Sequence, residues 1–216
     1  MSSEHTISRS PDRPCPGLER MGGFSDGVLA VVITLMVLDL KPPANARLEA
    51  LLPLWPTAIS YAVSYAFIAV VWINHHHLTR FIRRIEPQLI WLNFAHLFVV
   101  SLLPFATAWM AATRLGPAPV ALYATLFVAV NLAYAAFQRA VIRQADSQAF
   151  PEHTRRAAWR RVQITVTMFA AAAALAFVAP IPAVGLICAA LGFYVRPDAT
   201  PAPKPRIRHA LISVAA

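Results

Sequence analysis

Residues 20–43 read RMGGFSDGVLAVVITLMVLDLKPP, an apolar run that carries a Ser-Asp pair in its first half. About 20 apolar residues cross the hydrocarbon core of a bilayer, so this run predicts a transmembrane helix. A carboxylate near the centre of such a helix costs roughly 2.5–3.5 kcal/mol, and it normally faces the protein interior or water. Asp26 lies about a turn and a half beyond Arg20, nearer one membrane surface than the midplane. The role of Asp26 is therefore the first question that the sequence raises.

The composition of the whole chain is that of a membrane protein. Of the 216 residues, 58% are hydrophobic and 13% are charged, whereas soluble domains contain about 45–50% apolar residues. The formal net charge is +9, but the cationic residues lie between apolar runs rather than on a soluble face, so we expect a lipid bilayer and no nucleic acid as partner. Two cysteines, Cys15 and Cys188, predict no disulfide framework.

Apolar segments recur along the rest of the chain. They lie at about residues 21–40, 54–74, 88–112, 118–138, 160–179 and 181–195. The last one is short and follows Pro180 and Pro182, so the final two segments form either a tight helical hairpin or one long broken helix. We favour the hairpin because proline removes a backbone donor and restricts the residue before it. The predicted fold class is an all-α integral membrane protein with six transmembrane helices per subunit.

Lysine and arginine in the connections set the orientation of these helices. With a cytosolic N-terminus, the outer side holds only three of the 19 cationic residues, namely Lys41, Arg47 and Arg114. This distribution satisfies the positive-inside rule and places both termini in the cytosol. The predicted organisation is a polar N-terminal cytosolic segment at 1–19, a six-helix transmembrane domain at 20–196 and a proline-containing cytosolic tail at 197–216.

Candidate partners for Asp26 occur at the same predicted membrane depth. The stretch WINHHHLTRF, residues 72–81, lies at the inner end of the second span, and Asn93 and His96 lie in the inner part of the third. Asp26 acts either as a structural carboxylate in a polar cluster or as a proton or ion ligand. We favour the structural role.

The three consecutive histidines at 75–77 do not predict a metal site. Consecutive helical residues point about 100° apart, so the three rings cannot converge on one ion. We expect no cofactor and no metal site. We also expect no enzyme activity, because the chain shows neither a nucleophile–base pair nor a metal triad.

A stripe at helical spacing runs along the first helix and comprises Gly27, Val31, Thr34 and Leu38. These positions fall within roughly 60° of one another around a helix, and Asp26 lies off the stripe. Around a symmetry axis, such stripes would line a pore with apolar rings and a ring of hydroxyls. An ordinary packing face is the alternative, with Gly23 and Gly27 as a small-residue contact and Thr34 bonded back to the Ala30 carbonyl. Periodicity alone favours the packing face.

A resemblance to a known family shifts that balance. Arg20, Phe24, Ser25 and Asp26 form an R-x-x-x-F-S-D signature, and WINHHH at 72–77 and LNFAHLFVVSLLPF at 92–105 are further matches. Together these motifs resemble the endolysosomal potassium channel family called transmembrane protein 175, over about residues 20–110. Bacterial members of that family have one six-helix repeat. The resemblance implies a homotetrameric cation channel, permeable to potassium and other monovalent cations, with the first helix lining the pore and a location in the bacterial inner (plasma) membrane.

The resemblance also assigns roles to residues. The implied pore-lining residues are Val31, Thr34 and Leu38. The implied supporting polar network, which ties the first helix to the second and third, comprises Arg20, Phe24, Ser25, Asp26, His75, His76 and Asn93. The chain departs from the family at Val31, where a larger residue is usual, and at Thr79, where Phe is common. Because neither the family nor this chain has a TVGYG carbonyl filter, selectivity would come from side-chain rings and a narrow apolar passage.

A secondary transporter or proton-coupled permease, with Asp26 as the proton carrier, is the alternative function. Transporters of this kind show paired internal repeats with broken helices at the midplane. We find no convincing repeat between the two three-helix halves of this sequence.

Overall fold

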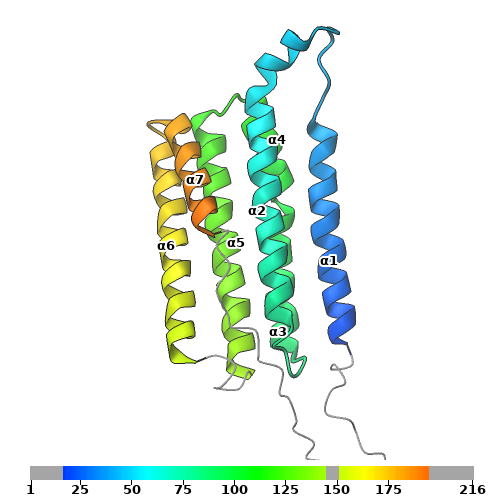
Figure 1. Ribbon diagram of the computed structural model, residues 1–216, viewed down its shortest axis with the longest axis vertical. Coiled ribbons are helices and arrows are strands. Elements are labelled where there is room, and N and C mark those ends of the chain that lie inside the picture. Colours follow the sequence, from blue (N-terminus) through cyan, green and yellow to red (C-terminus); the bar gives the residue numbers. More distant parts are fainter. Residues whose placement is uncertain (1–16, 145–150, 195–216) are drawn as a thin grey trace, which may run out of the picture.

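The computed structural model describes residues 17–144 and 151–194, and all regular structure in these ranges is helical. The predicted N-terminal segment up to residue 16, the tail at 197–216 and Cys15 lie outside the described residues. The long helices run side by side along one axis, with α1 at one side of the bundle and α6 at the other (Figure 1).

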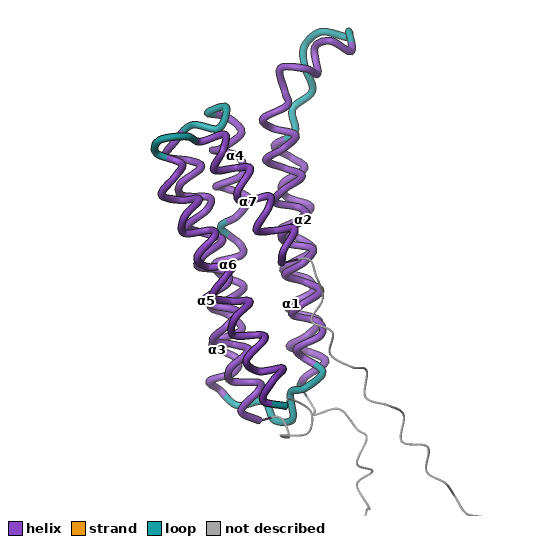
Figure 2. Tube along the Cα trace, turned by 60° about the vertical axis from the view of Figure 1, so that its left-hand side comes forward, coloured by secondary structure: helices purple, strands orange, loops and turns teal. Residues whose placement is uncertain are grey.

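The helices follow the apolar segments of the sequence. The α-helices are α1 (Leu18–Leu35), α2 (Trp55–Thr79), α3 (Pro87–Ser101), α4 (Leu103–Ala112), α5 (Pro117–Gln144), α6 (Glu152–Ala176) and α7 (Pro180–Tyr194). Two 3-10 helices, η1 (Met36–Asp39) and η2 (Leu48–Leu54), lie between α1 and α2. The segment that contains η2 extends beyond the end of the bundle in both views (Figure 2).

Four helical segments of the described chain are long and apolar enough to cross a membrane. They are Leu18–Asp39, Leu48–Thr79, Pro87–Ala112 and Pro117–Gln144. The remaining two helices, α6 and α7, pack against each other as a hairpin about a three-residue connection, Phe177–Ala179. Proline at the first position of α7 suits a helix start, because its missing donor has no partner there in any case.

The third predicted segment consists of two helices rather than one. α3 ends at Ser101 and α4 begins at Leu103. Pro104 explains the break, since its ring lacks a backbone donor and clashes with the carbonyl four residues earlier, that of Val100.

Stacked aromatic rings hold the centre of the bundle. Phe67 of α2 stacks on Phe127 of α5 with ring centroids 3.7 Å apart, and Phe169 of α6 meets both rings edge-on. All three side chains are fully buried. Each such pair contributes about 0.5–1.5 kcal/mol beyond the burial of its area.

Among the four membrane-length segments, the one that contains α1 is the least buried. In the most apolar 18-residue stretch of Leu18–Asp39, 22% is buried, against 56% in that of α5. The main helix contacts of α1 are with α2, α3 and α4, and the side chains on its opposite face are left exposed in its own subunit.

Candidate functional site

α1 has one face turned into the subunit and an opposite face turned away from it. Ser25, Leu29 and Val32 are buried, whereas Val31 is 54% exposed and Thr34 is exposed. At 100° per residue, Val31 and Thr34 lie on the side of the helix opposite the buried residues. The stripe that the sequence singled out is therefore the outward face of α1.

Leu38 does not lie on the α-helix that the stripe assumed. It belongs to η1, which has three residues per turn rather than 3.6. The tighter winding rotates Leu38 around the axis relative to a straight α-helix, toward the side of Leu35. Both side chains stay exposed, and Leu38, at 74%, is among the most exposed leucines of the described chain.

The hydroxyl of Thr34 bonds back to its own helix. It donates to the carbonyl of Ala30 at 3.0 Å or of Val31 at 3.0 Å, as the packing-face interpretation expected. With its proton directed at the backbone, the hydroxyl oxygen keeps lone pairs on the outward face of α1. Back-bonding and a role in binding cations are thus compatible at this residue.

A buried hydrogen-bond chain joins α1, α2 and α3. The Nδ2 amide of Asn93 donates to Ser25 Oγ at 2.9 Å, and Ser25 donates in turn to the Met21 carbonyl at 2.9 Å. The Asn93 Oδ1 atom lies 2.8 Å from His75 Nε2. An amide oxygen only accepts, so the proton of the His75 ring lies on Nε2. Every donor in the chain has one acceptor, which fixes the rotation of α1 against its neighbours.

Asp26 makes a separate contact with α2. Its Oδ1 accepts a hydrogen bond from the indole Nε1 of Trp72 at 2.8 Å. The ring of His76 stacks on that of Trp72, with the two centroids 5.4 Å apart. The Nε2 atom of His76 lies 3.0 Å from a guanidinium nitrogen of Arg80. The candidate partners from the sequence are the stretch at 72–81, Asn93 and His96, and the structure selects Trp72, the first residue of that stretch. The indole of Trp72 is largely apolar, but its single N–H donor can serve a carboxylate.

The remaining residues of the expected network lie outside these two contacts. Phe24 is exposed and meets Phe94 edge-on at 5.4 Å, while Arg20 is exposed and makes no hydrogen bond or ion pair with another described residue. His96, a candidate partner of Asp26, instead lies parallel to His75 with ring centroids 6.1 Å apart. The structure therefore brings together Ser25, His75 and Asn93, and separately Asp26 and His76 through Trp72.

A second buried polar cluster, which the sequence did not suggest, lies beside η1. Ser64 Oγ is 2.7 Å from Thr107 Oγ1 and 2.6 Å from the Tyr123 hydroxyl, so it links α2, α4 and α5. Thr107 donates to the Leu103 carbonyl at 2.7 Å and lies 3.9 Å from the sulfur of Met36. In the sequence, the sign of this cluster is that each of the three hydroxyl residues stands within an apolar run. Their convergence beneath Met36 holds the end of α1 at the point where it tightens into η1.

The part of the chain that contains the hydrogen bonds of Ser25, Asp26 and Asn93 matches a known family. Residues 20–104 match the family model described as endosomal/lysosomal potassium channel TMEM175. A potassium channel of Chryseobacterium sp. (strain P1-3) is 36% identical over 124 residues, which cover 57% of this chain and 65% of that relative. A potassium channel of Chamaesiphon minutus is 30% identical over 191 residues, 81% of this chain and 91% of the relative. The crystal structure of a lysosomal potassium-selective channel TMEM175 homolog from Chamaesiphon minutus superposes with a TM-score of 0.71 at 28% identity, covering 83% of this chain and 97% of that one.

Proposed function

Since this chain belongs to the endosomal/lysosomal potassium channel TMEM175 family, we propose that it is a potassium-permeable cation channel of the bacterial inner membrane, assembled as a homotetramer around α1. The observation that carries the proposal is the outward face of α1. A helix that leaves one face uncovered in its own subunit, and that turns Val31 and Thr34 outward, is suited to line a path shared with other copies.

The side chains on that face suit cation passage without a carbonyl filter. Rings of Val31 and Leu38 around a common axis would form narrow apolar constrictions, which resist wetting and so limit conduction. Between them, a ring of Thr34 oxygens with lone pairs directed outward from each helix would replace part of the water shell of the ion. Selectivity then depends on side-chain rings, which single substitutions alter in every subunit at once.

We further propose six spans with both termini in the cytosol. The basic ends of α2 and α5 and the basic start of α6 lie at the same end of the bundle as the start of α1 (Figure 1). Those ends carry most of the arginines of the described chain, as the cytosolic side should. α6, with 25 residues, is long enough to cross, and α7, with 15 residues, returns beside it.

Labelling of a single cysteine tests this topology. In a background with Cys15 and Cys188 changed to serine, Pro117→Cys should react with a membrane-impermeant maleimide added outside intact cells, because the α4–α5 turn then faces outward. Gln144→Cys, at the other end of α5, should react only after the membrane is opened. Reaction of Pro117→Cys from the cytosolic side alone contradicts the six-span arrangement.

Flux through the purified protein tests the function itself. Reconstituted in liposomes with a potassium gradient, the protein should give unitary currents of more than about 10⁶ ions per second, which exceeds the turnover that a transport cycle with conformational steps on the μs–ms timescale allows. The same liposomes with a proton gradient and no potassium gradient examine the transporter alternative. Proton movement coupled to a solute, together with abolition of that coupling in Asp26→Asn, would replace the channel by a transporter.

A further inference from the structure

Exposed arginines gather where α5 ends and α6 begins, far from the pore helix. We call Arg139, Arg156, Arg160 and Trp159 the arginine collar. The guanidinium carbon of Arg139 lies 4.8 Å from the ring centroid of Trp159, which joins the two helices across their outer side. The three arginine side chains are exposed, and Trp159 is 38% exposed.

Among the described residues, one carboxylate, that of Glu152, forms an ion pair with the arginine collar. Arg156 pairs with Glu152 at 2.9 Å, but both side chains are 82% exposed, and exposed pairs of this kind contribute only about 0–1 kcal/mol. No other carboxylate among the described residues forms an ion pair with the collar. Among the described residues, a small anion or headgroup at this surface would therefore meet three cationic groups and one exposed carboxylate, that of Glu152.

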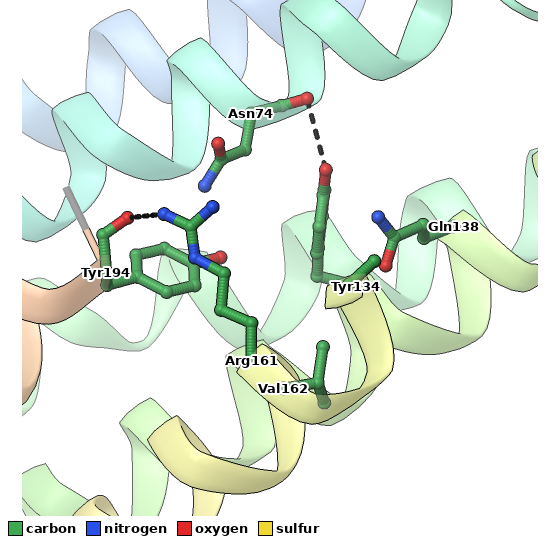
Figure 3. A pocket seen from close by; sticks show the side chains of 7 residues that line it. Asn74, Tyr134, Gln138, Arg161, Val162 and Tyr194 are labelled. Carbon is green, nitrogen blue, oxygen red and sulfur yellow. Dashed lines mark hydrogen bonds between the residues drawn. The ribbon is translucent and has the colours of Figure 1, made fainter. Parts of the chain in front are cut away.

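Two neighbouring arginines, Arg155 and Arg161, are hydrogen-bonded to backbone carbonyls, which separates them from the collar. Arg155 donates to the Ile142 carbonyl at 3.2 Å. Arg161 turns inward and donates to the carbonyl of Tyr194 at the end of α7, beside a cavity of about 30 Å³ (Figure 3). That volume accommodates one or two waters and no headgroup. Arg143 lines a different cavity together with Glu86.

The surface next to the collar is apolar and faces outward. Leu132, 52% exposed, lies seven residues before Arg139 and hence on the same face of α5. On α6, Ile164 is exposed one turn beyond Arg160. Along this surface, exposed apolar side chains are followed by the collar arginines and the partly exposed Trp159. A bilayer has the same order, because its acyl chains are followed by charged headgroups.

The position of α6 in the bundle indicates that the arginine collar faces the lipid bilayer. α1, the proposed pore helix, lies on the opposite side of the bundle from α6 (Figure 1). In an assembly built around α1, the collar would face the surrounding lipid at the inner leaflet. We propose that the arginine collar binds the phosphate of an anionic phospholipid of the inner leaflet, whose chains lie along the outer faces of α5 and α6. The inference rests on the proposed topology, but it does not depend on ion conduction.

Lipid competition tests the proposal. The full chain in detergent is offered equal amounts of phosphatidylglycerol and phosphatidylcholine, and the bound lipids are counted by native mass spectrometry. The wild type should retain phosphatidylglycerol preferentially. Arg139→Gln and Arg156→Gln should each lower that preference about fivefold, as expected for one arginine near an anionic surface, whereas Glu152→Gln should raise it. Arg139→Lys should restore most of the loss, because it keeps the charge.

Matched controls decide between the site and general basicity. Arg47→Gln removes one exposed arginine from the connection between α1 and α2, which lies at the opposite end of the bundle from the start of α6 (Figure 1). This variant should leave the preference unchanged. An equal loss in Arg47→Gln, or no loss in either collar variant, overturns the proposal. Displacement of the lipid by millimolar glycerol phosphate would also overturn it, since the site would then be one for free phosphate. Absence of potassium flux with the collar effects intact would defeat the channel function and leave the lipid site standing.

Discussion

Asn93→Leu should lower the stability of the folded subunit by about 1–3 kcal/mol, although both side chains branch at Cγ and have the same outline. Asn93 is the link between α1 and α2 in the buried chain, because it donates to Ser25 and accepts from His75. Leucine can do neither, and the His75 N–H would be left buried without a partner, which costs about 1–3 kcal/mol. Thermal or SDS-induced unfolding in detergent, followed by intrinsic fluorescence, measures the loss.

The partner residue supplies a sharper test than the single variant. Replacing both partners by apolar groups of similar shape is close to neutral, because no buried donor is left without an acceptor. His75→Phe retains the parallel stacking on Phe137, where the ring centroids are now 5.3 Å apart. We therefore expect Asn93→Leu with His75→Phe to be more stable than Asn93→Leu alone. Additive losses in the double variant would show that the hydrogen bond is not what stabilises this contact.

Asp26→Asn serves as the comparison within the same helix. Asparagine keeps an oxygen that accepts from the Trp72 indole, so the 2.8 Å contact survives without its charge. The loss should stay below that of Asn93→Leu, because Asp26 is only half-buried and its charge has access to water. A larger loss in Asp26→Asn would place the main anchor of α1 at Trp72 instead of Asn93.

The positions of the membrane helices follow from the hydropathy of the sequence averaged over long segments. Hydropathy averages over many residues, so a membrane helix is recognisable whatever its local details, and the helices that cover 21–40, 54–74 and 118–138 lie where the apolar runs predict them. The proline pair near residue 180 likewise predicts a turn, and α6 ends before it. These properties depend on composition and backbone chemistry alone.

Individual contacts depend on quantities that the sequence does not contain. His75 and His76 are adjacent and chemically identical, yet only His75 meets Asn93, because 100° of rotation separates them and the crossing of α2 and α3 selects one. The change from α1 to η1 at Met36 has no proline or glycine to announce it. It accompanies the burial of Met36 over the Ser64–Thr107–Tyr123 cluster. The contact of Met36 with Thr107 is a tertiary one, between residues 71 positions apart in the chain.

Thr34→Val should reduce discrimination between potassium and sodium while leaving the fold intact. Valine is close to threonine in volume, and the hydroxyl that it removes bonds only to the backbone of its own helix and to the exposed side. In a tetramer the variant loses one hydroxyl oxygen per subunit from a single ring. If these oxygens together favour potassium by about 1.4 kcal/mol, the permeability ratio falls about tenfold. Reversal potentials under bi-ionic conditions give that ratio directly.

Leu38→Ala acts on the same axis by a different mechanism. Leu38 is 74% exposed and takes little part in the subunit core, so its truncation should widen and wet an apolar ring without the usual penalty for a core cavity. We expect a higher unitary conductance and weaker discrimination among cations. Ile33 is the control, since it lies 100° from Thr34 around α1 and packs against the core. Ile33→Val should change stability slightly and permeation not at all. If Ile33→Val alters the permeability ratio while Thr34→Val and Leu38→Ala leave it unchanged, the face of α1 that carries Val31 and Thr34 does not line the ion path.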